Sequence, residues 1–333
     1  MKNPQHRVQI NILPVGGGDC IHLRFLSSDG KWRNIVVDSG PAGKRKVFRT
    51  LLKQISKYGE KIDLMCFSHI DNDHIKGAEL TMTSENVVSG LITQICMNIP
   101  EGVLPEQSTA GSFVQTGVTE ASSLLEKIVN LQIPCKTLTI QGDSVQLGDA
   151  VIRVLLPTQR RLDEYYVHLK KIGGFHAVAV SQDRDKVNGS SIALLFEMNS
   201  CRILLSGDAF SEDLAEVGEK YAGEKGFSVV KLPHHGSAAN ISAAMLEKLN
   251  TRDFIISTEQ NRYRPAAETM ELLSEYGGKC GSVNVYGNYE WPRFASGIPN
   301  VNIIYPEHGP VVTKEGIEIY ADGDSRRGYQ DSW

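Results

Sequence analysis

Two histidines and two aspartates are concentrated in the segment 68–77, directly after the apolar run 62–67. The four side chains with ligand atoms are His69, Asp71, Asp73 and His74. Imidazole nitrogens and carboxylate oxygens are common protein ligands of divalent metal ions. So dense a group at the end of an expected strand predicts a divalent-metal site, where a bound ion can activate water for hydrolysis.

The spacing of these side chains has a physical basis. In an extended chain, residues i and i+2 lie on the same side, so His69 and Asp71 can approach one cation together. Asp73 and His74 lie where a helix would begin, and they could hold a second, neighbouring ion. A simpler interpretation remains open: Asp71, Asn72 or Asp73 could cap the following helix, and His69 could be a hydrogen-bonded core histidine.

Two further segments place ligand-type side chains at the ends of expected strands. The strand 201–205 leads to Asp208, and the strand 227–232 leads to His234 and His235. An aspartate at a strand end is common in turns, whereas His-His-Gly is not a usual turn sequence. We therefore expect three separate strands to deliver metal ligands from their C-terminal ends.

Together these motifs resemble the metallo-β-lactamase fold, in the branch that includes the hydrolase domain of the ComEC DNA-uptake proteins. The matching segments are 15–21, 36–40, 69–77, 188–195, 204–208 and 232–237. They occur in order over most of the chain. The resemblance implies an α/β (α+β) fold, a four-layer αββα sandwich with metal ions in a cleft at one edge of its two sheets.

The resemblance also implies which residues would hold the ions. His69 and Asp71 would serve one ion. Asp73 and His74 would serve the other, and Asp208 would bridge both.

The pair His234 and His235 would supply a ligand or a proton-transfer group, and the sequence does not decide which of them faces the metal. Our working assignment makes His234 a ligand and His235 catalytic. Asp73 would orient the attacking water and receive its proton, and a histidine would then protonate the leaving oxygen.

Several positions depart from the family pattern. Asp71 stands where most members have histidine, and Asn188 and Ser191 lie in a region where many members have another histidine ligand. Arg264 also replaces a histidine, and a guanidinium cannot bind a cation but can bind a phosphate. We therefore expect the first metal site to be weak or empty, and we assign Asn188, Ser191 and Arg264 to substrate binding. His308 could substitute as a ligand or be a solvent-exposed turn residue.

The leading hypothesis is a metal-dependent hydrolase, namely a phosphodiesterase or nuclease acting on DNA or a nucleotide. The carboxylate-rich ligand set shifts the preference of the one or two ions from zinc toward manganese without excluding zinc. One alternative is a hydrolase of carboxylic esters, lactones or thioesters, because the fold alone does not select a reaction. Another is a binding or regulatory protein that kept the scaffold but lost catalysis.

Composition limits the choice of partners. The 333-residue chain has a formal net charge of −4 and a pI near 6.2, so no overall basic field attracts duplex nucleic acid. A nucleotide or short single strand remains compatible with this net charge.

The six scattered cysteines predict buried thiols and not a disulfide framework. The sequence shows no signal peptide or membrane-length apolar run, so we expect a cytoplasmic protein without membrane association. The sequence does not identify a protein partner.

The chain is expected to form one domain, 1–320, followed by a polar tail, 321–333. Insertions are expected at about 81–112 and 158–188, and the second is either a solvated segment or a cap over the metal cleft. The aromatic residues within 282–299 either stack on bases or pin their loop to the core. Expected strands are 8–13, 20–25, 32–37 and 317–320, and expected helices are 46–58, 120–131, 211–221, 242–249 and 266–276.

Overall fold

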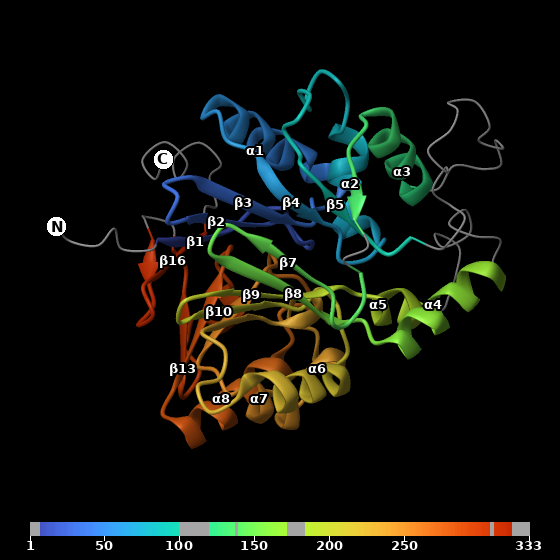
Figure 1. The fold of residues 1–333 in the computed structure, drawn as a ribbon. Coiled ribbons are helices and arrows are strands. Elements are labelled where there is room, and N and C mark those ends of the chain that lie inside the picture. The colour runs from blue at the N-terminus through green and yellow to red at the C-terminus, as the bar shows by residue number, and fades with distance from the viewer. Residues whose placement is uncertain (1–6, 100–119, 137–138, 172–183, 307–309, 322–333) are drawn as a thin grey trace.

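Two mixed β-sheets pack face to face in the computed structural model, which describes residues 7–99, 120–136, 139–171, 184–306 and 310–321. Helices cover the outer face of each sheet, so the layers follow one another as α, β, β and α (Figure 1). This arrangement confirms the αββα sandwich predicted from the sequence.

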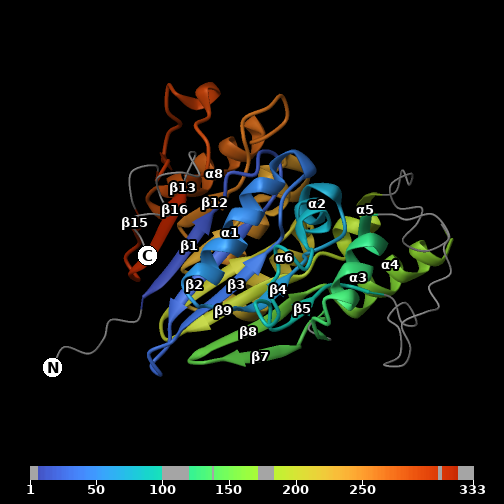
Figure 2. The ribbon, with the colours of Figure 1, turned by 90° about the horizontal axis from the view of Figure 1, so that it is seen from above.

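The first sheet combines the N-terminal strands with two strands from the end of the described chain. Its order is β15 (Val311–Val312), β16 (Ile317–Ala321), β1 (Val8–Ile12), β2 (Ile21–Leu26), β3 (Trp32–Val37), β4 (Ile62–Cys66), β5 (Ile95–Cys96) and β6 (Cys135–Lys136). Strands β3 to β6 are parallel, so their C-terminal ends meet at one edge. The helices on the outer face are α1 (Arg45–Lys57), α2 (Asn72–Thr81) and α3 (Glu120–Asn130) (Figures 1 and 2).

The second sheet has the order β14 (Val301–Ile304), β13 (Val283–Gly287), β12 (Asp253–Ile256), β11 (Val229–Lys231), β10 (Cys201–Leu205), β9 (Ala193–Met198), β8 (Ala150–Leu156) and β7 (Ser144–Leu147). Strands β10 to β14 are parallel. Its outer helices are α6 (Ser211–Val217), α7 (Ala243–Leu249) and α8 (Ala267–Cys280). Helices α4 (Gln159–Lys171) and α5 (Arg184–Gly189) lie at one end of the sandwich (Figure 1).

The main core lies between the two sheets. Alternate residues of β1 and β9 point into it because successive side chains of a strand face opposite sides. Phe25 of the first sheet meets Phe196 of the second edge to face, with ring centroids 5.1 Å apart. Burial of one such ring contributes roughly 1.5–3 kcal/mol, so this contact helps hold the sheets together and fixes the separation of the loops at their edges.

Most expected elements appear within a few residues of their expected bounds. Strands Trp32–Val37 and Cys201–Leu205 match their expected ranges, and helix 46–58 is observed as Arg45–Lys57. The helix expected at 211–221 instead ends at Val217 and continues as a π-helical turn, Gly218–Ala222. A Cβ atom on Gly218 would lie 2.5 Å from the Lys248 carbonyl carbon, so this turn packs directly on the α7 backbone.

The described residues test only some of the remaining expectations about the domain. All six cysteines are unpaired thiols, four of them buried, as the sequence predicted. Residues 100–112, 172–183 and 322–333, which belong to the two expected insertions and to the tail, lie outside the described residues. The one-domain division therefore stays a prediction. Within the described ranges, every helix is too short or too polar to cross a bilayer.

Candidate metal centre

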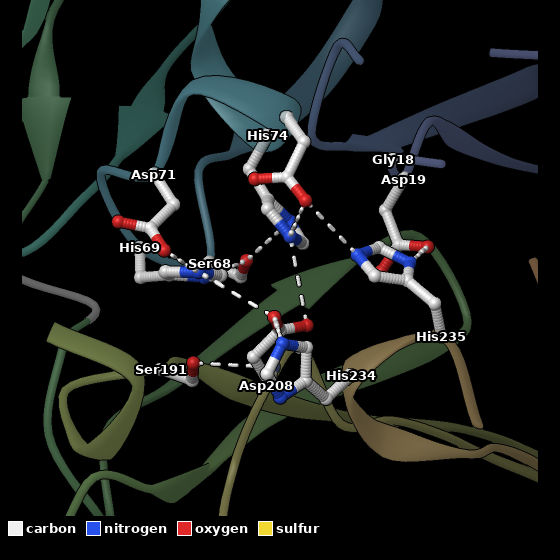
Figure 3. Close-up of polar contacts among 12 residues, drawn as sticks. Gly18, Asp19, Ser68, His69, Asp71, His74, Ser191, Asp208, His234 and His235 are labelled. Carbon is white, nitrogen blue, oxygen red and sulfur yellow. Dashed lines mark hydrogen bonds and ion pairs between the residues drawn. The ribbon is translucent and has the colours of Figure 1, made fainter. Parts of the chain in front are cut away.

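The predicted ligands converge at the edge of the sandwich where the parallel strands end. The loop after β4 carries His69, and the first turn of α2 carries His74. The turns after β10 and β11 carry Asp208 and the pair His234 and His235. All five side chains lie around one centre (Figure 3). The expectation that separate strands deliver these groups to a common place is therefore met.

One set of contacts surrounds the Oδ2 atom of Asp208. His69 Nε2 lies 3.8 Å from this oxygen and 3.8 Å from Asp71 Oδ2. His234 Nε2 lies 3.5 Å from the same Asp208 oxygen. Separations of this size exceed a hydrogen bond but suit atoms that share a cation, because each metal–ligand bond is about 2.0–2.2 Å long.

A second set of contacts lies on the other side of Asp208. His74 Nε2 is 3.5 Å from Asp208 Oδ1 and 4.0 Å from Asp73 Oδ2. His235 Nε2 is 3.4 Å from the same Asp73 oxygen. The two carboxylate oxygens of Asp208 thus face different groups of ligands, as a bridging carboxylate would.

Asp19 joins this second set, although no ligand role was predicted for it. One ligand atom from each of Asp19, His74, Asp208 and His235 lies within 4.8 Å of the others, and all four residues are buried. Asp19 belongs to the β1–β2 connection, and a Cβ atom on the preceding Gly18 would lie 2.2 Å from the Asp73 carbonyl oxygen. A single aspartate after three glycines is a weak signal. Asp19 is identified as a member of the cluster only because the β1–β2 connection packs against α2 in the fold.

Several ligand atoms are buried without a hydrogen-bond partner. They are Asp19 Oδ1, His69 Nε2, His74 Nε2, Asp208 Oδ1 and His235 Nε2. Unpaired buried polar atoms are rare in native proteins because each loses its hydration without compensation. Their common orientation fits a divalent cation, which would satisfy imidazole nitrogens and carboxylate oxygens together.

Neighbouring groups fix which nitrogen of each imidazole faces the centre. Asp38 Oδ2 accepts a 2.8 Å hydrogen bond from His74 Nδ1. The Ser68 hydroxyl donates to the same Asp38 oxygen and therefore accepts from His69 Nδ1 at 3.0 Å. His235 Nδ1 donates to the Ser257 carbonyl at 3.1 Å. Each ring therefore turns its Nε2 toward the centre, and this is the nitrogen that would bind a metal after losing its proton.

The backbone that presents the histidine pair is strained. His234 and His235 have φ values of +51° and +55°, and Asp38 has a φ of +62°. Residues other than glycine rarely occupy this left-handed region, and each such position costs on the order of 1–3 kcal/mol. Surrounding contacts must hold these conformations, for example the 2.8 Å hydrogen bond between His234 Nδ1 and Asn240 Oδ1.

Electrostatics at the centre favour paired charges. Burial opposes the charging of His74, but Asp208, Asp38 and Asp73 outweigh it and raise the pKa of His74 well above its usual value. Burial likewise opposes ionisation of Asp208, yet His74 and His235 hold the pKa of this carboxyl well below its usual range. A divalent ion can replace the protons on these imidazoles, so metal binding and proton release are coupled here.

Comparison with known proteins agrees with the architecture. No family model matches the chain. It is 22% identical over 284 residues to ComE operon protein 3 of Bacillus subtilis (strain 168), a match that covers 80% of this chain and 31% of that protein. The two packed sheets with their outer helices form an αββα sandwich. The chain thus spans about a third of the length of this curated relative.

Two solved structures illustrate the likeness in fold. The metallo-β-lactamase fold protein YhfI from Bacillus subtilis is 12% identical, with a TM-score of 0.41, 90% of this chain covered and 96% of that chain. CmlA, a diiron β-hydroxylase from Streptomyces venezuelae, is 13% identical, with a TM-score of 0.46, 81% of this chain covered and 51% of that chain.

The positions that depart from the metallo-β-lactamase pattern lie in and around the centre. Asp71 precedes the first residue of α2, but its side chain makes no capping hydrogen bond and points toward His69. Ser191 Oγ accepts a hydrogen bond from the Asp208 backbone N–H at 3.2 Å, and Asn188 is also buried. The Arg264 guanidinium contacts His234 Nε2. His308 lies outside the described residues.

Proposed function

We propose that this protein is a metal-dependent hydrolase that cleaves phosphodiester bonds in a nucleic acid or nucleotide. The observation that carries the proposal is the set of buried, unpartnered ligand atoms around Asp208. Imidazoles combined with carboxylates suit zinc or manganese. A bound divalent ion would lower the pKa of water toward neutrality and polarise the phosphoryl group.

The geometry supports a specific division of the ligands. His74, Asp208 and His235, with Asp19, would hold one ion. His69, Asp71 and Asp208 would hold a second ion, because His69 Nε2 lies 3.8 Å from a carboxylate oxygen of each aspartate.

The exposure of the histidine pair supports a reassignment of their roles. The His235 side chain is fully buried, with 0% of its surface accessible, whereas 21% of the His234 side chain is exposed. A fully buried imidazole cannot meet a substrate atom. We therefore assign His235 to the metal and His234 to proton transfer, the reverse of the working assignment from sequence.

The residues that would handle substrate lie on the accessible side of the centre. Asp73, whose side chain is 35% exposed, would orient the attacking water and accept its proton. His234, whose Nδ1 donates to Asn240 Oδ1, would protonate the leaving oxygen from Nε2 as the imidazolium, and would be left as the neutral ring with Nδ1 still protonated. Arg264 beside His234 would bind a phosphate oxygen, and this contact favours a phosphodiester over a carboxylic ester.

Elemental analysis and a cleavage assay on the purified protein test this proposal. We expect bound zinc or manganese and hydrolysis of a single-stranded oligonucleotide that a chelator abolishes. Asp208→Ala should remove metal and activity together. Asp73→Ala should lower kcat roughly 10²- to 10⁴-fold, the usual contribution of a positioned general base. Asp29→Ala, in the exposed β2–β3 turn, is the control and should leave both unchanged.

Three results would contradict the proposal. Full turnover in both Asp73→Ala and Asp208→Ala would remove the centre from the reaction. Faster hydrolysis of a carboxylic ester or thioester than of any phosphodiester would favour the alternative reaction class. Stoichiometric metal without turnover of either class would favour a binding or regulatory protein.

A further inference from the structure

The loop between β12 and α8, which contacts the metal centre through Arg264, exposes an aromatic side chain. Tyr263 is 71% exposed, more than any other large hydrophobic side chain of the described residues, where the next value is 59% for Val312. A single exposed apolar residue is ordinary by itself. Three features distinguish Tyr263. Hydrogen bonds hold the backbone of its loop, arginines lie near it, and the next residue, Arg264, contacts His234 of the centre.

The backbone that carries Tyr263 is held by a dense set of hydrogen bonds. Asn261 Oδ1 accepts from the backbone N–H groups of Tyr263 and Arg264, both at 2.8 Å. Asn261 N–H also donates to the Arg264 carbonyl at 2.9 Å. Arg293, from the neighbouring loop after β13, donates to the Asn261 carbonyl at 2.6 Å. The aromatic ring is therefore presented from a pre-organised turn and loses little conformational entropy on binding.

Three arginines lie on the loop that carries the ring or contact its backbone. The Arg262 guanidinium lies 5.5 Å from the Tyr263 ring centroid, Arg264 follows in sequence, and Arg293 fastens the loop. Within the described part of the chain, none of the three forms an ion pair with a carboxylate. This local positive charge contrasts with the net charge of −4 of the whole protein. Uncompensated guanidinium groups are well suited to phosphate oxygens.

Arg264 connects the loop to the metal centre. Its guanidinium contacts His234, whose Nε2 is 3.5 Å from Asp208 Oδ2. A phosphate bound at Arg264 would therefore lie beside the proposed ligands. The adjacent nucleotide of the same strand would then come close to Tyr263.

We propose that Tyr263, with Arg262, Arg264 and Arg293, forms a subsite that stacks an unpaired nucleobase and binds the phosphates on either side of it. The substrate is accordingly a single-stranded polynucleotide, because duplex bases are not free to stack on a side chain. Base stacking on an aromatic residue contributes enough for roughly 5- to 150-fold in affinity. The inference rests on the proposed function for the direction in which the bound strand runs toward the metal centre. Binding of the strand to the subsite does not require cleavage.

A binding experiment without turnover tests the subsite. The full-length protein, kept in chelator, is titrated into a fluorescent single-stranded oligothymidylate and into an abasic strand of equal length, and anisotropy is recorded. Tyr263→Ala should weaken oligothymidylate binding roughly tenfold and abolish most of the preference for it over the abasic strand. Tyr263→Phe keeps the ring and should retain this preference. Tyr58→Ala removes another exposed tyrosine, at the end of α1, and should not change it.

Salt dependence provides a second measurement of the same subsite. Removal of one phosphate contact from a single-stranded complex lowers the slope of log Kd against log salt by about 0.7. Arg262→Gln should produce this change for both strands, because the phosphates are common to them. An unchanged slope would remove Arg262 from the subsite.

The two proposals can fail separately. If Tyr263→Ala binds both strands as the unmodified protein does, the subsite is overturned, even where metal-dependent cleavage is observed. If the protein binds oligothymidylate through Tyr263 but never cleaves it with zinc or manganese, the subsite stands and the proposed hydrolysis is wrong. Equal affinity of the unmodified protein for the thymidylate and abasic strands would also overturn the subsite.

Discussion

His22 shows how a single buried residue connects the fold to pH. It lies on β2 with no exposed surface, with Nε2 2.9 Å from Asn34 Oδ1 and Nδ1 3.3 Å from Asn11 Nδ2. These partners suit a neutral ring that donates from Nε2 and accepts at Nδ1. Burial lowers the pKa of His22 from 6.5 to about 4.

The lowered pKa predicts a loss of stability in acid. Between pH 6.5 and about 4, the unfolded chain binds a proton at His22 that the folded chain does not. The neutral ring therefore contributes fully above pH 6.5, and about 3 kcal/mol is lost as the pH falls through this window. We expect the urea-unfolding free energy of the unmodified protein to decrease more than that of His22→Gln between pH 7 and pH 4.5. Both proteins are measured in chelator, so the other histidines contribute equally.

Equal pH dependence of the two proteins would show that His22 keeps its ordinary pKa in the fold. The remaining residues of the polar network, Asn11 and Asn34, are unchanged in this comparison. A difference in the pH dependence of the unfolding free energy between the two proteins therefore arises from the imidazole.

At the scale of elements, the β1–β2 connection is fitted closely to the start of α2. The Asp19 N–H donates to the Asp73 carbonyl at 3.3 Å, and this contact requires glycine at position 18. Gly17, its neighbour, would have no atom within 4 Å of an added Cβ. Alanine at position 18 would both clash and restrict the backbone, whereas alanine at position 17 would only restrict the backbone. The two adjacent glycines thus provide a matched pair of variants.

We expect Gly18→Ala to lower stability by about 1–3 kcal/mol, the usual cost of overpacking, and to weaken metal binding by displacing Asp19 from Asp73. Gly17→Ala should change stability by less than about 0.5 kcal/mol. Thermal unfolding and metal titration of both variants measure the two effects. Similar metal affinity in the two variants would show that the β1–β2 connection does not position the centre.

At the scale of the whole molecule, the metal centre connects the two sheets. His74 follows a strand of the first sheet, whereas Asp208 and His235 follow strands of the second. An ion held by all three would join the two halves of the sandwich, and it would bind the folded chain in preference to the unfolded one.

Metal should therefore raise the unfolding temperature of the intact protein. A free ion concentration about 100 times the dissociation constant stabilises the folded state by about 2.7 kcal/mol. Calorimetry with manganese or zinc, compared with chelator, measures this increase, and Asp208→Ala should remove most of it. An identical unfolding temperature with and without either ion would show that the cluster does not bind metal in the folded protein.

The local sequence determined the elements and the ligand-bearing loops. An apolar run predicted the end of β3 and helical spacing predicted α1, because both patterns reflect the buried surface of a single element. The ligand-type side chains after β4, β10 and β11 likewise begin three residues beyond the strand that each follows. These features need no knowledge of distant contacts.

The tertiary structure decided which residues meet. Asp19 joins the cluster only because the β1–β2 connection packs against α2, and the difference between His234 and His235 depends on burial by neighbouring loops. The aromatic segment 282–299 could have stacked on bases, yet Tyr286 and Trp291 are buried, and Tyr263 is exposed instead. Burial and distance between remote segments arise from packing of the whole chain, which no local pattern encodes.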